Sequence, residues 1–311
     1  MASDATITPE TLGQPSMAFA SADPASYSGI YAFGASLVDA GNIYRLSLGL
    51  VPASPPYSSG RFSNGPVWVQ DLAAGLGLPP LGPSVSGGTD FAFGGAETGT
   101  TPVHTANLID LPFQLTQFNQ SVPNPNPNAL YVVSAGSDDL LDMISAGPRQ
   151  PSVLLANIAS AVGNESQFIS GLAARGAKNV LVLNVPDLGK TPRFIQAGIP
   201  LANLASAASA AYDTDLSNSL GPLASSEGLN LKILDAYTLL NQAIASPQSF
   251  GFIDVRDPVW TGNFYNPFSG TLLAATPQAQ NQFLFWDSLH PTAQGHALLA
   301  AAAFNLLNTT A

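Results

Sequence analysis

The chain has 311 residues, of which 46% are hydrophobic and 9% are charged, and its formal net charge at pH 7 is -11. This length and apolar content suffice for one large domain with a sizeable core, and the excess of acidic residues argues against nucleic acid as a partner, because phosphate backbones require a basic surface. The chain contains no cysteine, which excludes disulfides, thiolate catalysis and cysteine metal sites and leaves the redox compartment undecided.

Short β-branched or aromatic runs alternate with longer stretches of helical periodicity. In chain order, the predicted strands are residues 30–33, 89–93, 130–134, 179–184 and 231–235. The predicted helices are residues 66–76, 113–119, 152–174, 202–220, 237–246 and 293–307. Because helices separate the strands, the pattern predicts a central five-stranded parallel sheet with helices on both faces, which is a three-layer α/β/α sandwich.

The domain organisation expected from this pattern is simple. Residues 29–311 are predicted to form one domain, because strand and helix alternation resumes directly after the two Pro-rich loops at 51–64 and 123–127. Residues 1–28 are expected to be a loosely ordered extension without the basic and apolar regions of a signal peptide. No apolar run reaches the length of a membrane span. The acidic, charge-poor composition predicts a secreted or periplasmic protein.

Polar and glycine residues follow four of the predicted strand ends. Ser36, Gly94–Gly95, Gly136–Asp139 and Pro186–Asp187 lie just past the first, second, third and fourth predicted strands, respectively. Because the loops at the carboxyl ends of parallel strands form the ligand crevice of such a sheet, these residues are expected to converge on one edge.

A serine nucleophile requires a neutral imidazole to accept its proton, and the imidazole requires a carboxylate on its other nitrogen. Of the three histidines, only His290 has an aspartate, Asp287, near enough in sequence for one loop to present both. His296 lies in an apolar helical stretch and is interpreted as a packed or capping residue, and His104 as a surface residue. The sequence therefore predicts a triad of Ser36, Asp287 and His290. No cluster has metal-ligand spacing, so neither a metal nor another cofactor is expected.

Five sequence blocks occur in a fixed order, at residues 33–42 (FGASLVDAGN), 60–68 (GRFSNGPVW), 90–96 (DFAFGGA), 135–139 (AGSDD) and 287–290 (DSLH). Together they resemble the SGNH, or GDSL, hydrolases, and within them the bacterial esterase, lipase and lecithinase-like branch. The resemblance runs from about residue 30 to the end of the chain. It implies a flavodoxin-like fold and serine-dependent hydrolysis of carboxylic esters through an acyl-enzyme, without a cofactor.

The resemblance also implies a role for each site residue. Ser36 would be the nucleophile, His290 the base and Asp287 its orienting partner. The oxyanion hole would use the backbone N–H groups of Ser36 and Gly95 and the side chain at position 138. Such donors act by pointing to the place where negative charge develops in the tetrahedral intermediate.

Two positions depart from the family's pattern: Ala35 replaces an aspartate beside the nucleophile, and Asp138 replaces the asparagine that donates to the oxyanion. The first change is expected to remove a contact that stabilises the loop. An ionised Asp138 has no donor, whereas a protonated one keeps a single O–H. Three interpretations follow: a carboxyl held protonated beside Asp139, a side chain that caps a helix beginning at Leu140, or a degraded site.

The substrate stays open at this stage, because selectivity depends on the shape of the pocket. Short acyl esters, glycerolipids, choline esters and O-acetylated sugars all fit the chemistry, as does acyl transfer to another alcohol. A small-molecule or lipid ester is the expected partner, and the oligomeric state is not determined by the sequence. The rival hypothesis is a binding protein that keeps the fold without the reaction.

Overall fold

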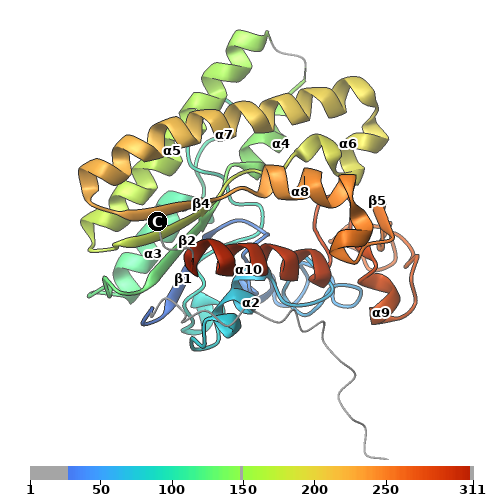
Figure 1. Ribbon diagram of the computed structural model, residues 1–311, viewed down its shortest axis with the longest axis horizontal. Helices are drawn as coiled ribbons and strands as arrows, with labels where there is room; N and C mark the ends of the chain where they lie inside the picture. Colours follow the sequence, from blue (N-terminus) through green and yellow to red (C-terminus); the bar gives the residue numbers. More distant parts are fainter. Residues whose placement is uncertain (1–26, 148–149, 309–311) are drawn as a thin grey trace, which may run out of the picture.

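A parallel sheet lies at the centre of the computed structural model, which describes residues 27–147 and 150–308 (Figure 1). Its strands are β1 (Ile30–Gly34), β2 (Leu130–Ser134), β3 (Asn179–Leu183) and β4 (Asn230–Leu234), and they lie side by side in this order. The register is regular, with Ile30 opposite Leu130 and Leu130 opposite Asn179. Four of the five predicted strands are therefore confirmed.

The fifth predicted strand, residues 89–93, is where the prediction of a five-stranded sheet is wrong. This segment runs parallel to β1 and exchanges backbone hydrogen bonds with Ala32 and Gly34, but it pairs with β1 only through an isolated bridge at Asp90. It occupies the free edge of β1, opposite β2. With this segment counted as a second strand, the spatial order would be 2-1-3-4-5, the flavodoxin-like order.

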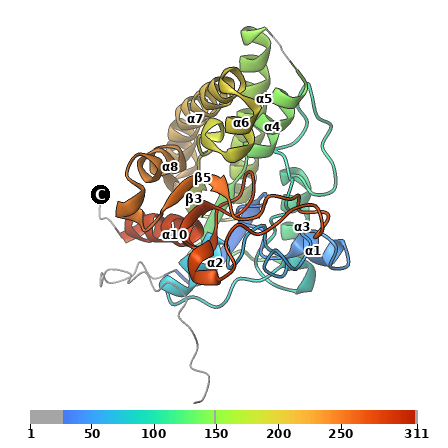
Figure 2. The same ribbon diagram turned by 90° about the vertical axis from the view of Figure 1, so that its right-hand side faces the viewer.

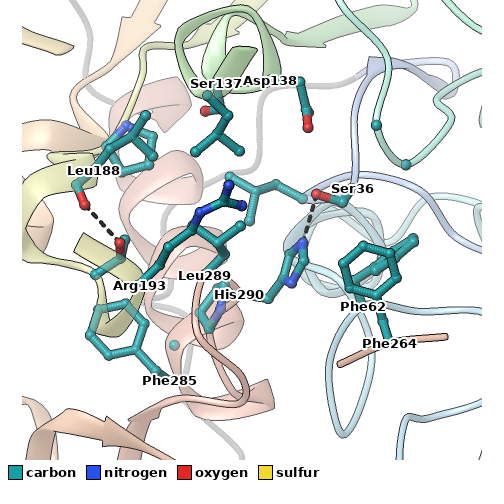
Figure 3. A pocket seen from close by; sticks show the side chains of 18 of the residues that line it. Ser36, Phe62, Ser137, Asp138, Leu188, Arg193, Phe264, Phe285, Leu289 and His290 are labelled. Carbon is teal, nitrogen blue, oxygen red and sulfur yellow. Dashed lines mark hydrogen bonds between the residues drawn. The ribbon is translucent and has the colours of Figure 1, made fainter. Parts of the chain in front are cut away.

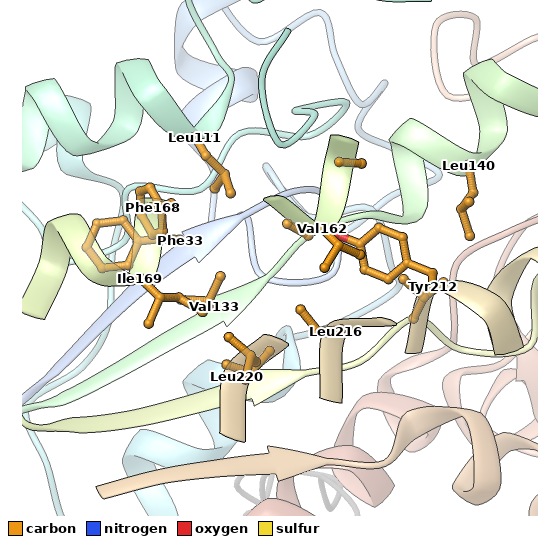
Figure 4. Close-up of a cluster of buried hydrophobic side chains, with 14 of the residues drawn as sticks. Phe33, Leu111, Val133, Leu140, Val162, Phe168, Ile169, Tyr212, Leu216 and Leu220 are labelled. Atoms are coloured by element: carbon orange, nitrogen blue, oxygen red, sulfur yellow. The ribbon is translucent and has the colours of Figure 1, made fainter. Parts of the chain in front are cut away.

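Helices cover both faces of the sheet, as expected for three layers. Alternate residues of each strand point to opposite faces. Phe33 and Val133 pack on the face covered by α3 (Leu111–Ser121), α5 (Pro151–Ala174) and α7 (Ile199–Glu227). Figure 4 shows part of this cluster, in which Phe168, Ile169, Leu216 and Leu220 meet the strand residues. Ala32 and Val132 face α2 (Trp68–Gly75) and α10 (Ala293–Asn308) on the other side (Figure 1).

All six predicted helices are present, although most begin or end a few residues away from the predicted bounds. They are the five helices named above and α8 (Ala236–Ala245). The described chain also contains the short elements α1 (Asn42–Leu46), α4 (Ser137–Ser145), α6 (Pro192–Ala197), α9 (Pro277–Gln280), β5 (Asp254–Pro258) and β6 (Phe283–Phe285), of which only α4 was anticipated, as a helix beginning at Leu140. Strands β5 and β6 form a separate parallel pair. None of the described helices combines the length and apolarity needed to cross a membrane.

The expected N-terminal extension, residues 1–28, lies outside the described residues except for its last two.

Candidate active site

The end of β1 directs Ser36 into the crevice at the edge of the sheet. Gly34 has a φ of +127°, and a Cβ at this position would collide with the carbonyl group of Ser134 on β2. The neighbouring backbone is tied to the same strand, because the Ala35 N–H donates to the Ser134 carbonyl at 3.0 Å. Only glycine permits this turn and this close approach. The chain therefore leaves β1 beside the end of β2, at the carboxyl edge of the sheet, where ligands bind in such sheets.

Ser36, His290 and Asp287 lie together, although 254 positions separate the serine from the histidine. Figure 3 shows the contact between Ser36 and His290. The Ser36 Oγ is 2.9 Å from the His290 Nε2. The His290 Nδ1 is 2.8 Å from the Asp287 Oδ2. The order of these contacts, hydroxyl to imidazole to carboxylate, is the geometry that serine nucleophiles need.

Three further donors fix the Asp287 carboxylate. Its Oδ1 accepts hydrogen bonds from the backbone N–H groups of Leu289 and His290, both at 2.8 Å. Its Oδ2 accepts one from the Tyr57 hydroxyl at 2.7 Å. No sequence motif marks Tyr57 for this role, because its partner lies 230 positions away.

Replacing Tyr57 with phenylalanine is expected to lower kcat by about tenfold with little change in KM, because a hydrogen bond to a charged group contributes about 1.5 kcal/mol. Tyr57 acts here as a positioning residue, so the measurement is the pH profile of kcat as well as its size. Tyr131→Phe is the matched control, since the Tyr131 hydroxyl donates to the Asn126 carbonyl in another part of the fold. Equal losses in both variants would contradict the positioning role.

The opposite charges of Asp287 and His290 stabilise each other. Burial disfavours the charged form of Asp287, but the positive charge of His290 and the hydrogen bonds from His290 and Tyr57 outweigh it and hold the pKa of Asp287 below its usual value. Burial also opposes protonation of His290, but the charge and hydrogen bond of Asp287, together with the charge of Asp138, raise the pKa of His290 above its usual value. The pair is thus arranged to stabilise an imidazolium.

Backbone donors flank the Ser36 hydroxyl. The N–H groups of Ser36 and Gly95 make no hydrogen bond within the described part of the chain. Gly95 has a φ of +84°, in the left-handed region, and it borders the same cavity as Ser36. The preceding Gly94 N–H donates to the Asp39 Oδ2 at 2.9 Å, which ties the glycine block to the serine block. Both donors are therefore free to bind a ligand oxygen.

A buried polar cage braces this region. Asp39 accepts hydrogen bonds from the N–H groups of Gly41, Asn42 and Ile43 at the start of α1. The Asn42 side chain donates to the carbonyls of Asp90 and Ala92 beside β1. Asp39 and Asn42 therefore tie the start of α1 to the segment beside β1. Ala35, which stands where the family has an aspartate, packs against the apolar side chains of Phe93 and Ala96.

Asp138 lies at the cavity wall, and its side chain points toward Ser36 (Figure 3). Helix α4 begins at Ser137, three residues before the expected Leu140, so Asp138 lies inside its first turn. Its carboxyl makes no capping hydrogen bond there. Burial, followed by the charges of Asp139 and Asp142, raises the pKa of Asp138 to about 7, against the opposing charges of His290 and Arg193.

These residues open into a cavity of about 560 Å³. Most of its lining is apolar, and Phe62 and Phe264 pack against the His290 ring, with centroids 5.1 and 6.4 Å away. The lining continues between α8 and α10, where it consists of Leu239, Leu240, Ala243, Leu284, Leu298 and Leu299. A volume and lining of this kind are typical of sites for small apolar ligands.

The other two histidines lie elsewhere. His296 is buried and accepts a hydrogen bond from the Trp68 N–H at 3.2 Å. Burial and the nearby His290 lower its pKa to about 3, so it is a neutral packed residue, as predicted. His104 is not the surface residue that the sequence predicted, because it bridges Glu97 at 3.0 Å and Asp110 at 2.7 Å with its side chain only 15% exposed.

Among the described residues, one group has donor atoms close enough to hold a metal ion. The donor atoms of Glu97, His104 and Asp142 lie within 4.8 Å of one another. Both ring nitrogens of His104 already contact carboxylates, so an ion would have to displace Glu97 or Asp110 from the ring.

Comparison with known proteins identifies relatives that match most of the chain. The model of the family described as GDSL-like lipase/acylhydrolase matches residues 30–303. A protein named phosphatidylcholine-sterol acyltransferase, from Aeromonas hydrophila, is 28% identical, and the match covers 91% of each chain. Esterase EstA from Pseudomonas aeruginosa is also 28% identical, over 92% of this chain and 48% of its own length.

Solved structures give weaker matches. An extracellular lipase from Streptomyces rimosus has a TM-score of 0.40 at 19% identity, covering 90% of this chain and 98% of the lipase. The family match carries the assignment, because it spans nearly all of the described residues, including the serine, glycine and Asp–His segments. The chain belongs to the GDSL-like lipase/acylhydrolase family.

Proposed function

We propose that the chain hydrolyses carboxylic esters with Ser36 as nucleophile, His290 as general base and Asp287 as its orienting partner. The observation that carries this proposal is the 2.9 Å contact between the Ser36 Oγ and the His290 Nε2, with the Asp287 carboxylate on the far side of the ring. The proposed catalytic unit is a single domain spanning residues 29–311, in a secreted or periplasmic protein.

The reaction follows from the proton positions. His290 accepts the Ser36 proton while the Oγ attacks the ester carbonyl carbon, and the resulting tetrahedral intermediate carries its negative charge on the former carbonyl oxygen. His290 then donates the proton to the departing alcohol and leaves an acyl group on Ser36. Water, deprotonated by His290, attacks this acyl-enzyme, and the imidazolium returns the proton to the Ser36 Oγ as the acid is released. No cofactor takes part in these steps.

The oxyanion in this scheme is bound by the N–H groups of Ser36 and Gly95 and by the protonated carboxyl of Asp138. The two N–H groups support this role because they have no partner within the described residues. Asp138 supports it because its side chain points toward Ser36 and burial raises its pKa to about 7, where the neutral acid persists near neutral pH.

The apolar cavity favours an ester with a hydrocarbon acyl chain over a sugar acetate. A second candidate function is acyl transfer, in which another alcohol replaces water in the last step. The observation in its favour is the 28% identity, over 91% of both chains, to the Aeromonas hydrophila protein named as an acyltransferase.

A fluorophosphonate probe tests the proposal, because attack by an activated serine displaces fluoride and leaves a stable phosphonyl ester. We expect mass spectrometry to find the label on Ser36 of the native protein and no label in the His290→Ala variant. His296→Ala is the comparison variant, since that imidazole is buried against Trp68. Labelling at another residue, or none between pH 6 and pH 9, would favour the rival hypothesis of a non-catalytic binding protein.

A further inference from the structure

Exposed apolar side chains gather on two segments beside the cavity mouth. Leu46, Leu48 and Leu50 lie at the end of α1 and in the turn after it, and Tyr265 and Phe268 lie in the loop between β5 and β6. Leu48 and Phe268 are 90% and 92% exposed, so neither contributes to the core. We call these five residues the apolar rim.

The two segments of the apolar rim lie side by side. The Ala53 N–H donates to the Phe264 carbonyl at 2.8 Å, which joins the turn after α1 to the β5–β6 loop. Figure 2 shows that this loop, in dark orange to red, extends across the molecule to α1. Leu46 and Tyr265 also line the cavity that contains Ser36. The exposed surface of the apolar rim is thus continuous with the candidate active site.

The backbone at Leu48 indicates that folding stability alone does not account for this residue. Its φ is +56°, and it is the one non-glycine residue with a positive φ in the described chain. The Gly49 N–H donates to the Tyr44 carbonyl and the Leu48 N–H to the Arg45 carbonyl, so Leu48 occupies the position after a helix that glycine usually takes. A leucine there is strained, and its side chain gains no burial in return.

The charge pattern identifies the kind of surface that the apolar rim fits. No acidic residue lies between Asp39 and Asp71, and no charged residue of either sign lies between Asp257 and Asp287. The chain as a whole carries a net charge of -11, which disfavours approach to an anionic membrane. The rim-bearing segments are therefore free of acidic groups in an otherwise acidic protein, which fits an uncharged or zwitterionic lipid surface.

We propose that the apolar rim inserts into an uncharged or zwitterionic lipid surface and that the active site takes its ester from that surface. Large apolar side chains that remain exposed mark sites of this kind. The second half of the proposal rests on the proposed ester hydrolysis, whereas the first half does not require catalysis.

Phosphatidylcholine vesicles test the binding step. We expect full-length protein carrying Ser36→Ala, which prevents hydrolysis of the vesicles, to cosediment with them. Adding Leu48→Asn or Phe268→Ser is expected to weaken the partition about tenfold or more, because each removes one large apolar group from lipid. Leu155→Gln is the matched control, because Leu155 is an exposed leucine in α5, outside the apolar rim.

Stability and soluble activity separate this role from damage to the fold. Leu48→Asn should leave the Tm unchanged or raise it, since asparagine tolerates the left-handed conformation better than leucine. With Ser36 restored, Leu48→Asn and Phe268→Ser should hydrolyse dissolved p-nitrophenyl acetate at the native rate. Their rate of hydrolysis of a long-chain p-nitrophenyl ester embedded in vesicles should be at least tenfold below that of the native protein.

Several results would overturn the proposal. One is unchanged partition of both variants, and another is binding to anionic vesicles alone. A third is a native protein that binds no vesicles and forms a dimer that either substitution dissociates. The apolar rim would then bind a second copy of the chain. A native protein that binds vesicles but hydrolyses no ester would refute the proposed function and leave the lipid-binding role standing.

Discussion

Asp287→Asn is expected to lower kcat/KM for a soluble ester by about ten-thousandfold at neutral pH, the size of loss that follows when a triad imidazole is held in the wrong tautomer. The local hydrogen bonds explain why. The N–H groups of Leu289 and His290 require an acceptor at Oδ1, so the asparagine would place its carbonyl oxygen there. Its NH₂ group would then face the His290 Nδ1 in place of the Asp287 Oδ2, which is 2.8 Å away in the native protein.

An NH₂ group at this position donates to Nδ1 and forces the imidazole proton onto Nε2. That proton would point at the Ser36 Oγ, so the imidazole would lose its ability to accept the serine proton. The variant also lacks the negative charge that raises the pKa of His290. Its remaining activity should therefore persist to lower pH than that of the native protein.

Asp187→Asn is the matched control for this experiment. Asp187 is also a buried aspartate that follows a strand, and its partners are the side chains of Ser206 and Asn241 in place of a histidine. We expect Asp187→Asn to retain activity within a few-fold of native, with any loss explained by a lower Tm. If Asp287→Asn kept more than about a tenth of native kcat/KM, Asp287 would not orient the catalytic imidazole.

The sequence predicted the fold best where the core imposes periodicity. Strand β2 (Leu130–Ser134) has the predicted bounds, because it is buried on both faces and reads as an uninterrupted apolar run. The segment 89–93 (TDFAF) was also predicted as a strand, yet it lies at the edge of the sheet and pairs with β1 through a single isolated bridge, between Ala32 and Asp90. Strands β5 and β6 left no recognisable pattern, because β5 reads DVRDP and is largely exposed, and β6 has only three residues.

Within the candidate site, residues joined by short sequence motifs were predictable and residues joined only by folding were not. Asp287 and His290 share one loop, and Ser36 ends a strand, so their types and positions indicated a common chemistry. The 2.7 Å hydrogen bond from Tyr57 to Asp287 connects a Pro-rich loop to the end of the chain, and no local pattern marks it. The αL conformation of Leu48 was equally hidden, since leucine gives no sign of a positive φ.

Asp138→Asn is expected to raise kcat/KM by about a hundredfold at pH 9, because one lost oxyanion donor costs about 2.7 to 4 kcal/mol in the transition state. In the native protein the Asp138 O–H is available only below its raised pKa of about 7. The proposed mechanism also needs a neutral His290, whose pKa is raised above its usual value. The two requirements overlap over a narrow range, so the native kcat/KM should follow a narrow bell with pH.

An asparagine at position 138 donates at every pH, so the alkaline fall should disappear. Removal of the Asp138 charge, which raises the pKa of His290, should also move the acidic rise to lower pH. The matched control is Asp142→Asn, one turn further along α4, whose charge raises the pKa of Asp138. It should keep the bell and shift its alkaline side to lower pH.

The profiles of the two variants separate the interpretations of Asp138. No gain at or above neutral pH in Asp138→Asn would mean that Asp138 donates nothing to the oxyanion, and that the N–H groups of Ser36 and Gly95 act alone. A loss at every pH would mean that the carboxylate itself is needed. A gain confined to alkaline pH, together with the opposite shift in Asp142→Asn, is the result expected for a neutral Asp138 carboxyl that donates a hydrogen bond to the oxyanion.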